Sequence, residues 1–557
     1  MSAGSGLALI PVELPWTKTE VVEGTTVDEL FDAGPTEALD VVAACVNSRV
    51  VPLDFAIECP SRVEPVDSAS KEGEEVVRRT ATLLLHGVAR KLFPKARLHV
   101  GQSLRGGYHY GVSGEHPPLA ELAATLDEAF HREADAGRQV VRQEVSIDSA
   151  LHLFEQEGEP LKVRLLRVWP SHRVPLVSCL GFTDIRHGPY ALSVRPCRSF
   201  RVEAHEQGLL LVFDGEAGEA ARREGGTVLY KAYTETKRWN ELVGVGTVPD
   251  LNDLCLGDRI KHVIRITEGQ HEKKIAELAD RIASRSDELR VVCIAGPSSS
   301  GKTTFVKRLS IQLEVNGITP RTLSLDDYYV DREKTPRDEE GDLDFEALEA
   351  IDLPLFLPHL KELVDGREVL TPIYDFRTGM RKERAEWRPR RLGENEVLLI
   401  EGIHALNPRL TETVDERHKF RIFINALTQL CIDDHNRIRT SDARLLRRIV
   451  RDRRYRNYSA ETSILRWPKV RAGEEKHIFP FQERCDAMFN SALAYETAVL
   501  RNFAYRFLLE VPPDSPAQAK GYQLRRFLEL FVPVWPDDVP ATSILREFIG
   551  GSGFSYK

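Results

Sequence analysis

The sequence contains no apolar run that approaches the roughly 20 residues needed for a membrane-spanning helix. Residues 1–14 also lack the long apolar stretch and cleavage site of a secretory signal. Hydrophobic residues make up 42% of the 557 residues and charged residues 29%, which is ordinary for soluble proteins. These absences argue against a membrane protein and predict a cytoplasmic one.

Paired cysteines and an excess of positive charge are missing as well. The 8 cysteines are scattered without a C-x-x-C pair, which argues against a zinc ribbon, a redox motif or a dense disulfide framework. The formal net charge of -9 lacks the basic excess typical of nucleic-acid-binding proteins, although local basic clusters stay possible on such a surface. The length predicts two to four domains, and no repeat of fixed period is present.

The first 240 residues predict two folded units. The first is a small α/β unit over 1–65, in which no catalytic cluster appears, and the second covers 66–240. The predicted strand of the first unit covers 7–12, and the predicted helices of the two units cover 26–32, 38–46, 74–93 and 119–136. The sequence is then strand-like to about residue 233. Apolar residues at helical spacing predict an amphipathic helix over 271–286, inside a connecting segment, 241–287.

A phosphate-binding loop opens the second half of the chain. An apolar strand predicted for 291–295 precedes the loop and a helix predicted for 302–315 follows it, which is the context this motif requires. Backbone N–H groups and the helix start then favour nucleotide phosphates. Lys302 can reach the β- and γ-phosphates, and the Thr303 hydroxyl can ligate magnesium. The loop therefore predicts ATP and Mg²⁺ as cofactors. The nucleotide-binding residues of the motif G-x-x-x-x-G-K-[ST] and its next neighbour are Gly296, Pro297, Ser298, Ser299, Ser300, Gly301, Lys302, Thr303 and Thr304.

Acidic residues at two further strand ends favour a kinase over a GTPase, a motor or a switch. Asp326 and Asp327 follow a strand predicted for 322–325, and phosphoryl transfer to an alcohol needs a carboxylate near the hydroxyl. The strand predicted for 397–400 ends in Glu401, a layout in which the acid holds magnesium. Thr303, Asp326 and Glu401 are thus the predicted metal ligands. A solvated acidic turn is the alternative for each strand end.

Alternating strands and helices predict a parallel sheet with helices on both faces. The remaining strand candidates are 420–424 and 505–511, and a further helix is predicted for 522–531 in a carboxy-terminal extension, 513–557. The fold class is therefore α/β, with a P-loop domain over about 288–512. All elements needed for phosphoryl transfer fall within 287–557, so this segment is expected to keep kinase activity on its own.

Together these elements resemble the uridine kinase and phosphoribulokinase family of P-loop kinases over about residues 288–512. The uridine-kinase branch has matching motifs in the same order, which here are Ser324–Tyr329, Gly341–Phe345, Pro372–Phe376, Glu401–Gly402 and the arginine-rich stretch from Arg444.

The resemblance implies roles for individual residues. Asp326 would be the base for the acceptor hydroxyl, Asp344 would hold the ribose hydroxyls, and Tyr374 and Phe376 would border the base. One position departs from the family: uridine kinases have a histidine that reads the pyrimidine edge, and Gly379 stands there. A purine nucleoside or a non-nucleoside alcohol therefore stays open as the acceptor.

The arginine-rich stretch predicts a lid over the active site, because guanidinium groups clamp phosphates. By the resemblance, Arg444 would contact the sugar, and Arg448 and Arg451 would contact the nucleotide phosphates. The other arginines are expected to face solvent or to pair with acids. The full set is Arg444, Arg447, Arg448, Arg451, Arg453 and Arg454.

The amino-terminal half resembles the leading ubiquitin-like (TGS) domain and the second additional, editing domain of threonyl-tRNA synthetase. Leu92–Pro94 and Gly106–Tyr110 are its landmarks. The family edits with H-x-x-x-H and C-x-x-x-H, but no histidine pair stands near residues 80–85, and Arg186 and Tyr190 occupy the second motif. The resemblance therefore implies a binding, regulatory or dimerising module without zinc or editing chemistry.

Three functions remain in competition at this stage. The first is an ATP-dependent nucleoside 5′-kinase acting on a small-molecule substrate. The second is a kinase of another alcohol, such as a sugar phosphate or a pantothenate-like compound. The third is an RNA-associated regulator whose amino-terminal half binds tRNA. Homo-oligomerisation and tRNA binding are open, and no membrane partner is expected.

Overall fold

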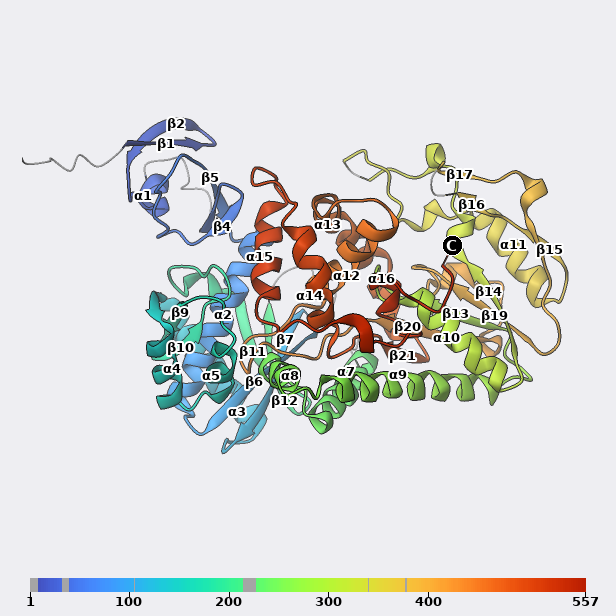
Figure 1. Cartoon of the computed structure of the whole chain (residues 1–557), viewed down its shortest axis with the longest axis horizontal. Helices are drawn as coiled ribbons and strands as arrows, with labels where there is room; N and C mark the ends of the chain where they lie inside the picture. The colour runs from blue at the N-terminus through green and yellow to red at the C-terminus, as the bar shows by residue number, and fades with distance from the viewer. Residues whose placement is uncertain are drawn as a thin grey trace, which may run out of the picture.

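The computed structural model describes residues 9–32, 40–104, 106–213, 227–338, 340–375 and 378–556. Within these ranges a small first region, residues 9–67, lies at the upper left of Figure 1, above a second region, residues 71–213. The region that begins with the strand before the phosphate-binding loop, at residue 291, occupies the right and is called the kinase-type region after the family that it resembles. The first region has a five-stranded sheet in the order β2-β1-β5-β3-β4. Its elements are β1 (Leu9–Leu14), β2 (Thr17–Val22), α1 (Val27–Asp32), β3 (Val41–Val46), β4 (Arg49–Val51) and β5 (Ser61–Asp67).

Alternation along β1 builds the core of this first region. Ile10, Val12 and Leu14 are buried while the residues between them are exposed, and they join the buried face of α1 in one apolar cluster. The helix predicted for 38–46 is wrong in its described part, because residues 41–46 form β3. This run is rich in β-branched residues, which fit a pleated, half-buried surface better than a helix.

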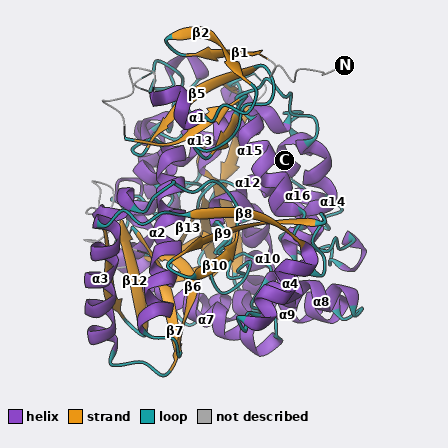
Figure 2. Ribbon diagram, turned by 90° about the vertical axis from the view of Figure 1, so that its left-hand side faces the viewer, coloured by secondary structure: helices purple, strands orange, loops and turns teal. Residues whose placement is uncertain are grey.

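The second region combines a four-stranded sheet, β11-β12-β7-β6, with a three-stranded sheet, β10-β9-β8. Figure 2 shows α3 beside β12 and β7. The elements are α2 (Lys71–Leu92), β6 (Ala96–Leu104), β7 (Gly107–Gly114), α3 (Leu119–Asp135), β8 (Val141–Ser146), α4 (Ile147–Gln156), α5 (Pro160–Leu166), β9 (Arg173–Cys179), β10 (Phe182–Ile185), β11 (Phe200–His205) and β12 (Gly208–Phe213).

Two predictions for this region have different outcomes. The helices expected at 74–93 and 119–136 are confirmed as α2 and α3. The strand-like interpretation of the following residues is wrong where α4 and α5 interrupt the strands. Ser146 begins α4 by accepting a hydrogen bond from the Ser149 N–H, a local capping signal that the apolar pattern does not carry.

The kinase-type region is built on a five-stranded sheet in the order β14-β19-β13-β20-β21, and every pairing in it is parallel. This confirms the predicted α/β fold class. Its main elements are β13 (Val291–Ala295), α10 (Lys302–Val315), β14 (Thr319–Ser324), α11 (Leu353–Val364), β19 (Glu396–Glu401), β20 (Lys419–Asn425), α12 (Thr440–Tyr455), α13 (Ala460–His477), β21 (Ala487–Asn490) and α14 (Glu496–Leu508). Two small hairpins pair β15 (Val369–Thr371) with β18 (Arg388–Arg390) and β16 (Tyr374–Asp375) with β17 (Met380–Arg381).

The fifth strand is not where the sequence predicts it. Residues 505–511 were expected to be a strand, but the chain is helical to Leu508. Leu508 and Val511 are buried three positions apart, which is helical spacing. The fifth strand is β21, whose four residues are too few to give a recognisable pattern.

The segment expected to be a linker is part of the folded core. It contains the end of α7 (Thr227–Val243), then α8 (Val248–Leu256) and α9 (Ile260–Ala283). Figure 1 shows α9 running from the second region to the kinase-type sheet. Ile275, Leu278 and Ile282 lie in the same apolar cluster as Phe305 of α10. The predicted helix is thus confirmed and is longer than expected, but it packs as a core element. The exact domain boundaries stay predictions.

The carboxy-terminal extension folds back onto this region. Helix α15 (Gln518–Leu528) packs against α14, and α16 (Arg546–Ile549) packs against α12. The helix predicted for 522–531 corresponds to α15. Among the described residues, no helix combines the length and apolar character that a bilayer crossing would require.

Candidate active site at the phosphate-binding loop

The loop between β13 and α10 has the tight shape that its glycines predict. Gly301 adopts a left-handed φ of 84°, and a β-carbon there would lie 2.4 Å from Ile544 Cγ2. A β-carbon at Gly296 would lie 2.1 Å from the Ile424 carbonyl oxygen. Both separations are shorter than a carbon atom can tolerate, so only glycine fits at either position.

Side chains from later in the chain hold the loop's carbonyl groups. Arg444 Nε donates to the Ser298 oxygen at 3.0 Å, and Arg447 Nη1 donates to the Ser299 oxygen at 3.4 Å. Ser491 Oγ donates to the Ser300 oxygen at 2.5 Å. These three hydrogen bonds turn successive carbonyl oxygens away from the place where a phosphate would bind. A phosphate-binding loop requires this, because its N–H groups must face the anion.

The arginines of α12 divide into two groups. Arg444 is buried and paired with Glu474, and Arg447 is buried and paired with Glu496. Both therefore lie in the protein interior behind the loop, where they hold its carbonyl groups. This position differs from the lid that the arginine-rich pattern predicts, and it favours a role for Arg444 in shaping the loop over direct contact with a sugar. Buried guanidinium groups need such carboxylate partners, because an unpaired buried charge is strongly destabilising.

Arg448 and Arg451, on the next turn of α12, share the carboxylate of Asp452. Arg448 Nη1 donates to Ser298 Oγ at 3.0 Å, and Arg448 Nε lies 3.2 Å from Asp452 Oδ2. Arg451 Nη2 lies 2.8 Å from Asp452 Oδ1. Asp452 therefore pairs with both guanidinium groups, of which Arg448 contacts the loop, and their assignment to nucleotide phosphates stays a prediction.

The catalytic and metal-binding candidates meet at the ends of neighbouring strands. Ser324 and Glu401 are paired in register at the ends of β14 and β19, and the Ser324 hydroxyl lies 3.5 Å from Glu401 Oε1. Lys302 Nζ donates to the Gly296 oxygen at 2.8 Å. Burial lowers the pKa of Lys302, and the nearby carboxylates of Glu401 and Asp326 oppose that shift. The three charged groups thus share one site.

The loop fits a nucleotide phosphate and its metal ion. Ser299 Oγ and Ser300 Oγ are buried and have no hydrogen-bond partner among the described residues. Thr303 is the second residue of α10, a position from which its hydroxyl can ligate a cation. Glu401 and Asp326 supply the hard oxygen atoms that magnesium prefers. The only acidic trio close enough to share an ion, within the described ranges, is Asp338, Glu340 and Asp342, and Lys469 already pairs with it.

The predicted acceptor residues gather around Tyr329. The Tyr374 ring lies 5.7 Å from the Tyr329 ring. Burial and the nearby charges of Asp326, Glu346 and Asp344 raise the pKa of Tyr329 well above its ordinary value. Asp326 and Asp344 therefore act electrostatically on the phenol whose ring lies beside that of Tyr374. Phe376 falls outside the described residues.

Asp344 and Gly379 have defined local roles. Asp344 Oδ1 accepts the backbone N–H groups of Glu346 at 3.0 Å and Ala347 at 3.1 Å, so it fixes this turn. Gly379 has a left-handed φ of 73°, and a β-carbon there would lie 2.6 Å from Arg332 Nε. Where the related kinases have a histidine, this protein therefore has a tight turn with an arginine beside it.

Two acids that the sequence analysis missed contact the loop directly. Glu474 Oε1 accepts the Ser298 N–H at 2.9 Å. Glu547 Oε2 accepts the Thr304 N–H at 3.2 Å and the Thr304 hydroxyl at 2.7 Å. They lie 176 and 243 residues from their partners, so no local pattern could reveal them. A carboxylate at the start of α10 also shows that this helix end accepts an anion.

Residues 434–436 of the kinase-type region pack against the second region beside the buried His86. The Val100 N–H donates to the Asp434 oxygen at 2.8 Å, and Asn436 Nδ2 donates to Asp184 Oδ2 at 3.0 Å. The His435 ring packs edge-on against His86, with their centres 4.4 Å apart. Burial lowers the pKa of His86 to about 3. These two histidine rings are therefore packed in the interface between the two regions.

Comparisons with known proteins match the two halves separately. Residues 291–498 match the Phosphoribulokinase / Uridine kinase family. The amino-terminal half is similar to threonine–tRNA ligases. The ligase of Clostridioides difficile (strain 630) is 29% identical over 168 residues, which are 30% of this chain and 26% of the ligase. The ligase of Symbiobacterium thermophilum is 29% identical over 198 residues, which are 35% of this chain and 30% of the ligase. The chain therefore spans less than a third of the length of these relatives.

Solved structures similar to this chain include two described as kinases. A putative fructose transport system kinase from Silicibacter sp. TM1040 is 19% identical, with 39% of this chain and 98% of the other covered and a TM-score of 0.28. A possible uridine kinase from Bacillus stearothermophilus is 20% identical, with 39% and 98% covered and a TM-score of 0.28.

Proposed function

We propose that this chain, whose residues 291–498 form a domain of the Phosphoribulokinase / Uridine kinase family, is an ATP- and Mg²⁺-dependent nucleoside kinase. The family match supports a small-molecule P-loop kinase. The observation that carries the finer proposal is the grouping of Asp326, Asp344 and Tyr374 around Tyr329, beside Lys302 and Glu401. The transferred group is the γ-phosphate, and the acceptor is the 5′-hydroxyl of a nucleoside.

In the proposed reaction, Asp326 takes the proton of the acceptor hydroxyl as its oxygen attacks the γ-phosphorus. The new P–O bond forms while the bond to the β-phosphate oxygen breaks, so ADP leaves. Lys302 and the N–H groups of the loop balance the charge that develops on the phosphate oxygens. Thr303, Asp326 and Glu401 would hold magnesium, which would supply positive charge to offset the negative charge of the phosphates. Asp344 and Tyr374 position the acceptor.

A second candidate is a kinase of an anionic alcohol, such as a sugar phosphate or a hydroxy acid. The observation in its favour is Arg332, whose guanidinium lies against Gly379 on the Tyr374 side of the site. A guanidinium binds phosphate or carboxylate oxygens well. By the resemblance, the neighbouring Gly379 stands where uridine kinases have the histidine that reads a pyrimidine.

An acceptor panel separates the two candidates. ADP release would be measured with ATP, Mg²⁺ and, in turn, pyrimidine nucleosides, purine nucleosides, sugar phosphates and hydroxy acids, each with and without tRNA. The first candidate would be supported if a nucleoside were phosphorylated and if the Arg332→Ala variant turned it over at a rate within a few fold of the parent. Turnover only with an anionic alcohol, lost in Arg332→Ala, would replace it with the second. A response only to tRNA would overturn both.

A further inference from the structure

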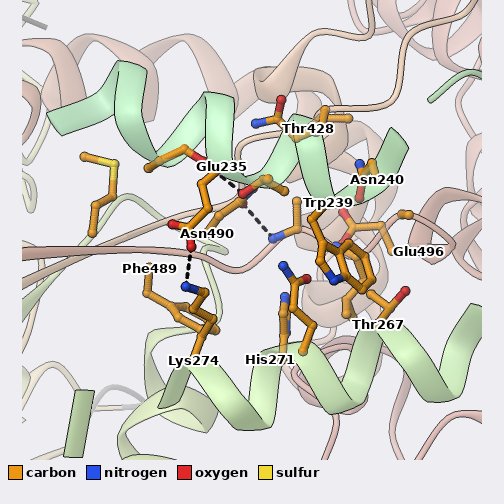
Figure 3. Close-up of a pocket in the computed structure, with 18 of the residues that line it drawn as sticks. Glu235, Trp239, Asn240, Thr267, His271, Lys274, Thr428, Phe489, Asn490 and Glu496 are labelled. Carbon is orange, nitrogen blue, oxygen red and sulfur yellow. Dashed lines mark hydrogen bonds and ion pairs between the residues drawn. The ribbon is translucent and has the colours of Figure 1, made fainter. Parts of the chain in front are cut away.

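A cavity of about 190 Å³ lies between the amino-terminal half and the kinase-type sheet, away from the phosphate-binding loop. Its walls come from α7, α9, the residues after β20 and the end of β21. In Figure 3, Trp239 projects from α7 toward α9, from which His271 and Thr267 project in return. Ligand sites favour junctions between folded units, and this volume, below the roughly 300–1,000 Å³ of a drug-sized pocket, suits a small molecule.

The walls suit a flat ring with polar edges. Trp239 and Phe489 supply aromatic surface, and buried leucines lie around them. The amides of Asn240 and Gln429 lie along the same cavity, whereas the amide of Asn490 is already hydrogen-bonded to Leu427 and Ala492. An amide side chain offers a donor and an acceptor side by side, which matches the paired donor and acceptor groups on the edge of a heterocyclic base.

Several polar atoms on this wall are buried without a partner. Thr267 is 2% exposed, His271 is 3% exposed and Gln429 is 9% exposed. Within the described chain, Thr267 Oγ1, His271 Nδ1 and both amide atoms of Gln429 make no hydrogen bond. Buried polar groups are nearly always satisfied, because leaving one unpaired is unfavourable. Their grouping on one cavity wall indicates that an occupant completes them.

The charged groups around the cavity are already balanced by the protein. Lys274 is paired with Glu235 and lies 3.1 Å from Glu277 Oε2. Glu496 is paired with Arg447, and Arg281 Nη2 donates to the backbone carbonyl oxygen of Asp486 at 3.0 Å, so within the described chain its charge is offset only by the nearby acids of the cavity wall. Burial lowers the pKa of His271 to about 3, so this ring is neutral at pH 7. The cavity therefore offers hydrogen bonds and aromatic surface without net charge, which favours an uncharged ligand over a nucleotide.

The far wall of the cavity is connected to the phosphate-binding loop. Arg447 Nε donates to Glu496 Oε1 at 3.1 Å, and Arg447 also donates to the Ser299 oxygen. The Leu493 N–H donates to Glu496 Oε2 at 3.0 Å, and Ser491, next to the cavity-lining Asn490, donates to the Ser300 oxygen. A ligand that orders residues 490–496 would thus act on the groups that hold the loop.

We propose that this cavity is an effector site for a small, uncharged heteroaromatic molecule of the nucleobase class, whose binding alters use of ATP at the phosphate-binding loop. Trp239 stacks on the ring, and Gln429, Thr267 and His271 supply hydrogen bonds to its edge. The ligand has no ribose, so it cannot serve as the acceptor of the proposed kinase.

Calorimetric titration of the full chain with free adenine, hypoxanthine, cytosine and uracil tests the site directly. We expect at least one base to bind once per chain with a Kd below about 1 mM. Trp239→Ala should weaken that binding at least about 10-fold, as expected for loss of a stacking ring, and Trp239→Phe should restore part of it. Gln429→Ala should weaken it independently. Leu242→Ala, on the exposed face of the same helix, is the matched control and should bind normally.

Two further measurements make the proposal refutable. Lys302→Ala should bind the base unchanged, because it alters only the phosphate-binding loop. The bound base should change the KM for ATP at least about threefold in the parent and not in Trp239→Ala. Absence of binding by every base, binding that survives Trp239→Ala and Gln429→Ala, or loss of binding in Lys302→Ala would each overturn the site. Binding without any change in ATP kinetics would overturn its role as an effector site.

Discussion

Removing α9 should destabilise the kinase-type region severely, although α9 precedes every motif of the phosphoryl-transfer site. The perturbation compares two fragments, residues 244–557, which keep α8 and α9, and residues 287–557, which do not. Ile275, Leu278 and Ile282 are 0%, 7% and 1% exposed and lie in the core cluster shared with α10. Arg308 of α10 also loses Glu272, whose Oε2 lies 2.7 Å from its Nη2.

The loss is large compared with the stability of a typical domain. Burial of a large apolar side chain contributes about 1.5–3 kcal/mol, so these three contribute about 5–9 kcal/mol. A whole domain is stable by only about 5–15 kcal/mol. We therefore expect fragment 287–557 to lack cooperative unfolding and kinase activity, in place of the independent activity that the position of the motifs predicts.

Thermal unfolding followed by circular dichroism, together with size-exclusion chromatography, measures the difference between the fragments. Fragment 244–557 should be the more stable of the two and should unfold cooperatively at the higher temperature. A monomeric 287–557 fragment with equal thermal stability and magnesium-dependent turnover would refute the reasoning, because α9 would then be dispensable to the core.

Four other outcomes follow from the site and the interface. Lys302→Ala and Thr303→Ala should each abolish turnover while the circular dichroism spectrum and melting temperature stay near those of the parent; full activity of a folded Lys302→Ala variant would remove the loop from the mechanism. Asp326→Asn should lower kcat about 100-fold or more with little change in ATP affinity, because it removes a positioned general base. If ATP affinity were lost instead, Asp326 would be a nucleotide-binding residue and not the base. Burial and the charge of Glu474 raise the pKa of Glu346 from 4.5 to about 7, so the folded state holds a proton that the unfolded state releases, and the free energy of unfolding should fall as pH rises from about 4.5 to 7. Glu346→Gln should remove this fall, which amounts to up to about 3 kcal/mol. If chemical denaturation gave the same pH profile for the variant and the parent, the result would count against the shift. Residues 1–240, or the full chain if they do not fold alone, should not hydrolyse seryl-tRNA specific for threonine and should need no zinc, which a deacylation assay with and without chelator checks.

The parts of the fold that the sequence predicts are those with a local signal. The helix expected at 302–315 coincides with α10 (Lys302–Val315), because a Gly-rich loop fixes its start. Strands β13 and β19 were equally clear as apolar runs. Strand β21 was missed because four residues carry no period, and 505–511 was assigned to a strand because its aromatic and branched residues imitate one.

The residues of the candidate site likewise include some that a local sequence motif predicts and others that only the folded structure reveals. The loop and the strand-end acids are contiguous motifs, so their residue types could be interpreted from spacing alone. The roles of Glu474 and Glu547 depend on contacts made 176 and 243 residues away, and the burial of Arg444 depends on how α12 lies under the loop. Such pairings arise from tertiary packing, which a single sequence without aligned relatives does not encode locally.

The loop of the kinase-type region that lies against the second region has a consequence for biosynthesis. Asn436, which donates to Asp184, follows its partner by 252 residues along the chain. At a synthesis rate of about 5–20 residues per second, Asp184 is added to the chain roughly 13–50 s before Asn436 is added. During that interval the seat of His435, between His86 and Phe182, is open to solvent. The second region is therefore exposed to chaperones and proteases in a form that the finished protein does not present, and an mRNA that slows translation between these codons would prolong that exposure.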